Sequence, residues 1–232
     1  MMPVSDMQSE AGKYVEAKDE LLTTARTALH RRPDRGSNER ALINAVIDES
    51  LVCHVGFIDD GQPVVVPSSP WRIDEWLYLH GAAGSRLIRQ VASGVPLCVS
   101  FALVDGLVFA RSAMRHSTNY RSVVLFGQGE AIEHPAGKTA ALMHLVEKLS
   151  PGRSELVRPP NERELAITSV VRLPILEGSA KVRAEGPTET SLDEGWEAWV
   201  GTVATRLRSL EPTALGGSPK SPLPMLPDWL RG

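Results

Sequence analysis

The residues that follow one predicted strand have the types and spacing of a phosphate-binding turn. Residues 76–80 alternate like a strand, small residues follow, and Ser85 and Arg86 precede the apolar positions of a helix predicted over residues 85–93. Ser85 is a typical helix N-cap. The first N–H groups of a helix favour an anion, and a guanidinium adds charge-assisted hydrogen bonds. The sequence therefore predicts a phosphate site here. The alternative is a plain strand–turn–helix connection with a solvated arginine.

Two further polar clusters lie later in the chain. Residues 110–122 include three arginines, His116 and Asn119 between two apolar strands. Such a loop is costly to order unless it binds something, and the alternative is a polar hairpin end at a subunit contact. In residues 179–183, Lys181 and Arg183 lie on the same side of an extended segment. The alternative there is ordinary edge-strand charge.

Composition narrows the classes of partner. The chain has 232 residues with 25 Lys and Arg against 28 Asp and Glu, a net charge of −3, so neither nucleic acid nor an anionic membrane is an expected partner. Residues 1–13 lack the apolar core of a signal peptide, and no apolar run approaches the roughly 20 residues of a membrane span. Cys53 and Cys98 lack CxxC spacing and are interpreted as reduced thiols of a cytoplasmic protein, although a disulfide between them stays open.

The chain divides into three predicted segments. Residues 1–36 form a polar arm with a helix over 16–29, residues 37–210 form one β-rich domain, and residues 211–232 form a Pro-rich tail that is mobile or lies along a surface. Within the domain, helices are expected after Ser37 and over 135–149. Hairpin turns are expected at Asp59-Asp60-Gly61 and at Asp105-Gly106. Later strands are expected at 120–133, with a bulge at Gly127 or Gly129, at 167–176 and at 200–207.

Six or seven strands joined by tight turns, with helices at the margins, predict a mainly β fold with peripheral α-helices. Because strands and helices do not alternate regularly, an antiparallel barrel is favoured over a parallel α/β sheet.

Several other chemistries lack their required residues. The segment Gly137-Lys138-Thr139 has Ile132 where a P-loop needs glycine, and Gly127-Gln128-Gly129 lacks the third glycine of a dinucleotide fingerprint. No G-x-S-x-G elbow is present. His144 and Glu147 are interpreted as solvated helix surface, so no metal site is predicted. No catalytic residue is assigned.

The ordered set of motifs resembles one protein family. The segments that carry the resemblance lie between about Arg32 and Leu210, at residues 52–56, 61–67, 78–81, 85–86, 105–112, 116–122, 151–153, 158–160, 164–165, 179–183 and 199–201. Together they resemble the flavin-nucleotide-binding branch of the pyridoxamine 5′-phosphate oxidase-like split-barrel family, which includes the nitroimidazole-reductase-like proteins.

The resemblance implies a six-stranded antiparallel split β-barrel and a homodimer that holds FMN in two clefts at the subunit interface. It implies three groups of cofactor-binding residues. Those beside the isoalloxazine are Val65, Val66 and Pro67, and those around the 5′-phosphate are Leu79, His80, Ser85 and Arg86. The partner subunit would contribute Asn119, Arg121 and Ser122, and the phosphate side or the mouth of the cleft would be closed by Lys181 and Arg183.

One departure from the family pattern bears on activity. Pyridoxamine-phosphate oxidases carry an Arg-x-Val-Leu-Leu-Lys type segment at the second strand, whereas this chain has Val64-Val65-Val66-Pro67, so oxidation of pyridoxamine phosphate is not expected. Two functions stay open. One is an FMN-dependent oxidoreductase that takes hydride from NADH or NADPH and acts on an unknown small molecule. The other is a non-catalytic flavin-nucleotide-binding carrier or sensor, or a deazaflavin- or haem-binding member of the same fold.

Overall fold

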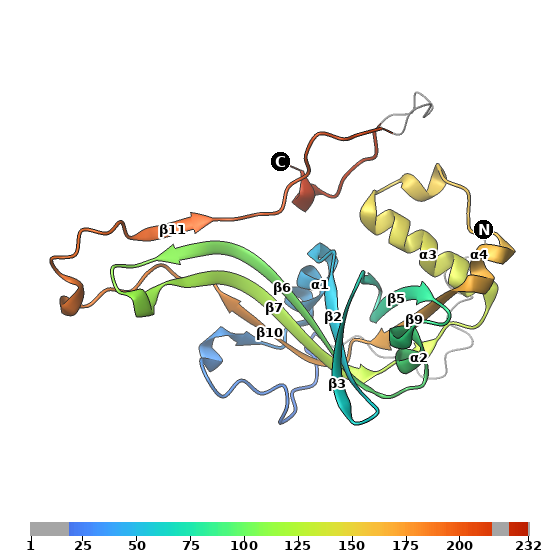
Figure 1. Ribbon diagram of the computed structural model, residues 1–232, viewed down its shortest axis with the longest axis horizontal. Coiled ribbons are helices and arrows are strands. Elements are labelled where there is room, and N and C mark those ends of the chain that lie inside the picture. Colours follow the sequence, from blue (N-terminus) through green and yellow to red (C-terminus); the bar gives the residue numbers. More distant parts are fainter. Residues whose placement is uncertain (1–18, 215–222, 232) are drawn as a thin grey trace.

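Two antiparallel sheets form the centre of the molecule (Figure 1). The computed structural model describes residues 19–214 and 223–231. The larger sheet has seven strands: β1 (Gly36–Ser37), β10 (Glu177–Arg183), β7 (Ser117–Gln128), β6 (Pro96–Phe109), β2 (Cys53–Asp59) and β3 (Gln62–Ser68) in this order, with β11 (Gly201–Ala204) beside β6. The smaller sheet has four strands: β4 (Trp71–Ile73), β5 (Trp76–Ala82), β9 (Thr168–Pro174) and β8 (Glu130–Ala131). The mainly β, antiparallel prediction is confirmed, but these two sheets hold more strands than the six expected.

Four α-helices complete the described part of the chain: α1 (Arg40–Glu49), α2 (Arg86–Ala92), α3 (Pro135–Leu149) and α4 (Glu162–Ile167). The apolar positions of α1, Ile43, Val46 and Ile47, are fully buried in a main core shared by both sheets. Helix α3 packs on a separate small core with Trp71 and Tyr78. Leu149, at the end of α3, is exposed.

The first Asp-Gly hairpin is confirmed. Asp60 and Gly61 have φ values of 50° and 72°, which is the left-handed backbone that a two-residue turn between β2 and β3 requires. Free thiols at Cys53 and Cys98 are also found, and burial raises the pKa of Cys53 to about 12.

The second predicted hairpin, at Asp105-Gly106, is wrong. Strand β6 continues through this pair, with a bulge between Val104 and Gly106. Strand pairing explains the difference, because β7 lies along one edge of β6 and β11 along the other. The chain turns back only at residues 110–116, so β6 and β7 form a long hairpin. Its outer part, residues 105–119, extends away from the body of the molecule with β11 along it (Figure 1). This outer part is called the arm from here on, and it is separate from the N-terminal residues 1–36.

The N-terminal segment is extended where the structure describes it. The predicted helix over 16–29 is wrong for residues 19–29, in which Glu20 pairs with Glu39 and Leu22 with Glu177 as isolated β-bridges. Leu21, between them, is 3% exposed and belongs to the main core. The segment therefore gains apolar burial and sheet-like hydrogen bonds that a solvated helix would not provide. Residues 1–18 lie outside the described part.

The later strands are shorter than expected. The predicted strand over 120–133 is divided at Gly129, where β7 ends in the larger sheet and β8 begins in the smaller one. A Cβ at Gly129 would lie 2.4 Å from Val91 Cγ1, so only glycine permits this crossing. Among residues 19–214 and 223–231, no helix is long and apolar enough to span a bilayer.

Candidate cofactor site

The turn between β5 and α2 has the capping geometry that the sequence predicts. Ser85 Oγ accepts a hydrogen bond from the backbone N of Ile88 at 3.3 Å. Gly81 lets α2 lie close to β5, because a Cβ at this position would be 3.0 Å from Ile88 Cγ1. The N–H groups before Ile88 have no intrahelical acceptor. They and the side chain of Arg86 are the donors that this turn offers to a ligand.

The side chain of Arg86 is 51% exposed and only partly engaged. Its Nε pairs with the carboxylate of Asp59 at the end of β2, and Gln90 Nε2 donates to the other oxygen of this carboxylate at 2.5 Å. The two terminal amino groups of Arg86 make no hydrogen bond to any residue that the structure describes. This free edge of the guanidinium has the geometry that binds a phosphate through two parallel hydrogen bonds.

The predicted flavin-ring segment lies on β3, the outer strand of the larger sheet. Val65 is 66% exposed, and Pro67 is also exposed, whereas Val66 packs against the main core. Strand alternation explains this division. The side chains of Val65 and Pro67 can therefore contact a ligand, whereas Val66 can contribute only its backbone.

Leu79 and His80 do not face the same space. The side chain of Leu79 is buried in the main core, and His80 points to the opposite side of β5, toward the small core under α3. There the His80 ring lies edge-on to Trp71 at 5.7 Å between ring centroids, and burial lowers the pKa of His80. Its Nδ1 is buried and has no hydrogen-bond partner among the residues that the structure describes. A single phosphate cannot contact both side chains.

Arg121 is bound on all sides within its own chain. It donates to both oxygens of Glu49 at 2.5 and 3.0 Å and to both oxygens of Asp105 at 3.0 and 2.8 Å. These hydrogen bonds hold the pKa of Arg121 above its ordinary value. The contacts connect the base of the arm to α1, so a ligand would have to displace a carboxylate to reach this guanidinium.

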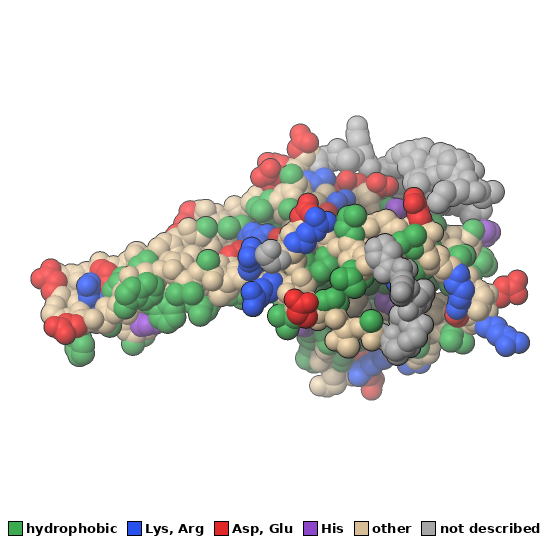
Figure 2. All heavy atoms as spheres, turned by 90° about the horizontal axis from the view of Figure 1, so that it is seen from above, with side chains coloured by type: hydrophobic (Ala, Val, Ile, Leu, Met, Phe, Trp, Pro, Cys, Tyr) green, Lys and Arg blue, Asp and Glu red, His purple; other side chains and the backbone are tan. Residues whose placement is uncertain are grey.

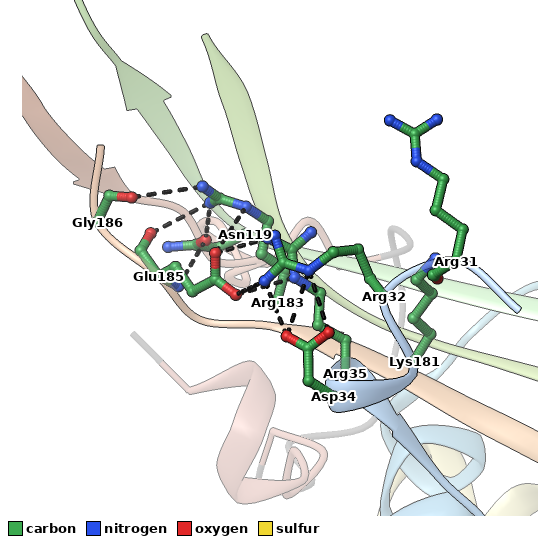
Figure 3. A network of polar contacts seen from close by, with 9 residues as sticks. All are labelled: Arg31, Arg32, Asp34, Arg35, Asn119, Lys181, Arg183, Glu185 and Gly186. Atoms are coloured by element: carbon green, nitrogen blue, oxygen red, sulfur yellow. Dashed lines mark hydrogen bonds and ion pairs between the residues drawn. The ribbon is translucent and has the colours of Figure 1, made fainter. Parts of the chain in front are cut away.

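Arg183 and Asn119 belong to a polar network at the end of β10 (Figure 3). Arg183 Nη1 donates to Asn119 Oδ1 at 2.5 Å and to the carbonyl of Glu185 at 3.1 Å. The backbone N of Glu185 donates to the same Asn119 oxygen at 3.2 Å. Arg183 is 7% exposed. Both side chains thus have structural partners that fix the chain after β10.

Lys181 and Ser122 lie opposite each other on β10 and β7. Ser122 Oγ donates to the carbonyl of Lys181 at 3.2 Å, and the ammonium of Lys181 has one long hydrogen bond, to the carbonyl of Arg31 at 3.5 Å (Figure 3). Lys181 is therefore the more available of the two cations on β10.

One chain does not bring all twelve predicted residues together. The β3 residues and the β10 residues are separated by three strands, β2, β6 and β7. Four interstrand spacings of about 4.8 Å separate β3 from β10 along the sheet, a path of roughly 19 Å. A shared site would need a second subunit to bring the two groups together.

The surface of the larger sheet that points away from the main core, here called the outer face, carries exposed apolar side chains. Cross-strand register places Ser122, Ala102 and Lys181 side by side on it. Exposed apolar side chains continue along it from β3 to the arm at Val65, Val104, Leu107 and Val203. Figure 2 shows hydrophobic side chains gathered along the arm. Exposed apolar side chains that recur along one face of a sheet favour a binding surface there.

An aromatic cluster near the tip of the arm was not predicted from the sequence. Phe109 contacts His116 edge-on with 5.9 Å between ring centroids, and Trp199 lies 5.9 Å from Phe109 on its other side. The sequence placed His116 only in a polar loop, because the misplaced hairpin hid its pairing with Phe109. The indole of Trp199 covers Gly201, where a Cβ would lie 2.6 Å from its ring.

Comparison with known proteins identifies the family. A model of the family described as pyridoxamine 5′-phosphate oxidase matches residues 39–182, more than half of the chain. The chain belongs to this family. A search of curated proteins found no match.

Two solved structures resemble this member of the pyridoxamine 5′-phosphate oxidase family over most of its length. The flavocytochrome Anf3 from Azotobacter vinelandii is 33% identical, covers 87% of this chain and 94% of its own, and has a TM-score of 0.79. The FAD and heme binding protein from Mycobacterium smegmatis is 31% identical, covers 82% of this chain and 94% of its own, and has a TM-score of 0.77.

A third structure, of a protein assigned to 5-nitroimidazole antibiotic resistance in Bacteroides thetaiotaomicron, shares the fold. It is 22% identical, covers 63% of this chain and 86% of its own, and has a TM-score of 0.54.

Proposed function

We propose that this protein binds a flavin nucleotide and haem and transfers electrons between them. The observation that carries the proposal is the similarity to a flavocytochrome and to an FAD- and haem-binding protein at 33% and 31% identity, over 94% of each of those chains. This supports the haem-binding alternative above more than it supports an FMN-dependent oxidoreductase. Turnover of a small molecule with NADH or NADPH stays a prediction.

The residues around α2 fit a flavin nucleotide. Arg86 presents a free guanidinium edge beside the first N–H groups of α2, and Val65 and Pro67 present an apolar strip on an outer strand. FMN and FAD share the 5′-phosphate that these donors would hold. FMN is the specific prediction from the sequence, whereas the second relative is described as binding FAD. When bound, a flavin accepts two electrons from a donor and passes them on singly, and haem accepts one at a time.

The outer face supports a homodimer as the binding form. Its exposed side chains at Val65 and Val104 lie on the same sheet as Ser122, which is expected to reach the flavin from the partner subunit. An obligate interface of this kind buries on the order of 2,000 Å² or more. Light scattering at micromolar protein should give twice the chain mass of 25.2 kDa. A monomer with flavin still bound would contradict the homodimer.

The absorbance spectrum of the purified protein tests the function directly. We expect a flavin band and a Soret band in one preparation, and reduction of the flavin by dithionite or NADPH followed by reduction of the haem. Acid release and chromatography of the yellow cofactor then distinguishes FMN from FAD. A deazaflavin has its own spectrum and would contradict the flavin assignment. A colourless protein that binds neither added FMN, added FAD nor haemin would contradict the whole proposal.

A further inference from the structure

We infer that His116 is the protein ligand of the haem iron, through Nε2, and that the apolar side of the arm is the haem-binding surface. The inference rests on the proposed function, because that proposal supplies the haem. It adds the residue and the place in the fold.

The hydrogen bonding of His116 leaves one ring nitrogen ready to bind a metal. Its Nδ1 lies 3.1 Å from the carbonyl oxygen of Ser112. Since a carbonyl only accepts hydrogen bonds, Nδ1 carries the proton and the lone pair is on Nε2. This arrangement, in which a backbone carbonyl fixes the tautomer and orientation of the ring, is typical of metal-binding histidines. His116 is exposed, so Nε2 is accessible.

The surroundings of His116 suit a flat apolar macrocycle. Phe109 lies edge-on against the imidazole, and Trp199, 63% exposed, lies beside Phe109. Leu107 and Val203 continue the same side of the arm and are exposed as well. Apolar surface exposed to water costs free energy, so this group of exposed aromatic and branched side chains indicates that a ligand covers this side of the arm.

The other five histidines are less suitable. His134 Nδ1 accepts a hydrogen bond from Ala136 N at 3.2 Å, so its Nε2 carries the proton. His80 lies in the small core under α3. His30, His54 and His144 are exposed, and none of them has a ring contact to an aromatic residue that the structure describes.

The flavocytochrome relative matches more of this chain than the family model does. A coverage of 87% leaves about 30 of the 232 residues unmatched, whereas 50 residues follow residue 182, where the family match ends. At least about 20 residues beyond the family match are therefore common to both. The described residues there include Trp199 and β11, which lie along the arm. The similarity to this flavocytochrome thus extends beyond residue 182.

Haemin titration of the purified dimer, followed by absorbance and electron paramagnetic resonance, tests the inference. His116→Ala should weaken haemin binding by about tenfold or more and change the Soret position and the spin state. Added imidazole should restore the original ligand field in His116→Ala. Trp199→Ala should weaken binding severalfold and leave the Soret position unchanged, because it removes apolar contact without removing the ligand.

His54→Ala is the matched control, since His54 is also an exposed histidine on the outer face and should leave haem binding intact. Flavin absorbance and far-ultraviolet circular dichroism show whether each variant is folded. A wild-type Soret band that persists unchanged in His116→Ala overturns the inference and leaves the proposed function standing, as does loss of haem in His54→Ala or His80→Ala alone. A wild-type protein that binds flavin and takes up no haemin overturns both the inference and the haem part of the proposed function.

Discussion

Arg86 at the start of α2 and Arg121 on β7 were both predicted as cofactor-binding residues, and their surroundings differ sharply. Arg86 is half exposed, and one of its three nitrogens pairs with one carboxylate. Arg121 makes four hydrogen bonds to the carboxylates of Glu49 and Asp105. The comparison shows that carboxylates brought from distant parts of the chain decide whether an arginine remains available to a ligand.

The largest expected effect is the loss of stability in Arg121→Ala. The substitution leaves two partly buried carboxylates close together without a counter-charge. Removing one partner of a fully buried pair costs about 3–5 kcal/mol, and because these groups are about a quarter to a third exposed we expect about 2–3 kcal/mol. Urea unfolding measures the free energy of unfolding of each variant. Arg86→Ala is the control, because it removes one exposed ion pair and should lower the free energy of unfolding by less than about 1 kcal/mol.

Equal stabilities of the two variants would contradict the comparison. So would a loss of flavin affinity in Arg121→Ala at full stability, because Arg121 would then be a ligand despite its four hydrogen bonds.

The next effect is on cofactor affinity. Arg86→Ala removes a charge-assisted contact to phosphate worth about 1.5–3 kcal/mol, so the Kd for FMN or FAD should rise about ten- to a hundredfold. Riboflavin, which has no phosphate, should bind the wild type and the variant nearly alike. Fluorescence titration of the apoprotein measures both.

Asp59→Asn sharpens this test. It removes the carboxylate that competes for Arg86, so phosphate-bearing flavins should bind Asp59→Asn at least as tightly as the wild type.

An equal loss of FMN and riboflavin affinity in Arg86→Ala would mean that Arg86 supports the barrel. An unchanged FMN affinity would assign the phosphate contact to Lys181 or Arg183.

Features determined by neighbouring residues were predictable from the sequence. The Asp60-Gly61 turn and the Ser85 cap each depend on fewer than five consecutive residues, and each is present. Strand alternation also places Leu79 and His80 on opposite faces. Grouping both around one phosphate followed the family resemblance and overlooked this alternation.

Features determined by distant strands were not predictable. Asp105-Gly106 has the composition of a turn, but β7 and β11 pair with both edges of β6 and keep it extended. Glu49 lies 72 residues before Arg121, so no local sequence pattern predicts that the two side chains pair. The aromatic cluster of Phe109, His116 and Trp199 was missed for the same reason, because a turn predicted at Asp105-Gly106 does not bring these residues together.

A third basic side chain, Lys148 on α3, is buried against carbonyl oxygens and not against carboxylates, and this difference should make the stability of the protein depend on pH. Its ammonium donates to the carbonyls of Ile47, Ser50 and Pro70 at 3.2, 2.7 and 2.7 Å, and burial lowers its pKa to about 8. Between pH 8 and its ordinary pKa of 10.5, the unfolded chain binds more protons at this group than the folded chain. Lys148 therefore makes the free energy of unfolding rise with pH in this window, by about 2–3 kcal/mol.

Lys148→Met isolates this contribution, because Tyr78 does not interact with Lys148 and titrates equally in both proteins, and Cys53, with a pKa of about 12, ionises above this window. The stability of the wild type relative to Lys148→Met should increase from pH 8 to pH 10, as measured by urea unfolding. A constant difference would mean that Lys148 remains charged throughout, held by its three carbonyl acceptors as firmly as Arg121 is held by carboxylates.

The smallest effect is expected from the C-terminal tail, in whose described residues a single backbone hydrogen bond leads back to an earlier part of the chain. Residues 223–231 are described, and Leu223 and Met225 in this stretch are exposed. The backbone of Leu230 accepts a hydrogen bond from Ser209 N at 3.0 Å, so the tail returns to the segment just before it. One exposed hydrogen bond is worth about 1 kcal/mol or less, and truncation after Leu210 should therefore lower Tm by about 2 °C or less.

A truncation of residues 223–232 alone is the control and should lower Tm by the same small amount. A decrease of several degrees in the longer truncation would show that the tail is docked on the barrel and that its apolar residues contribute to the fold.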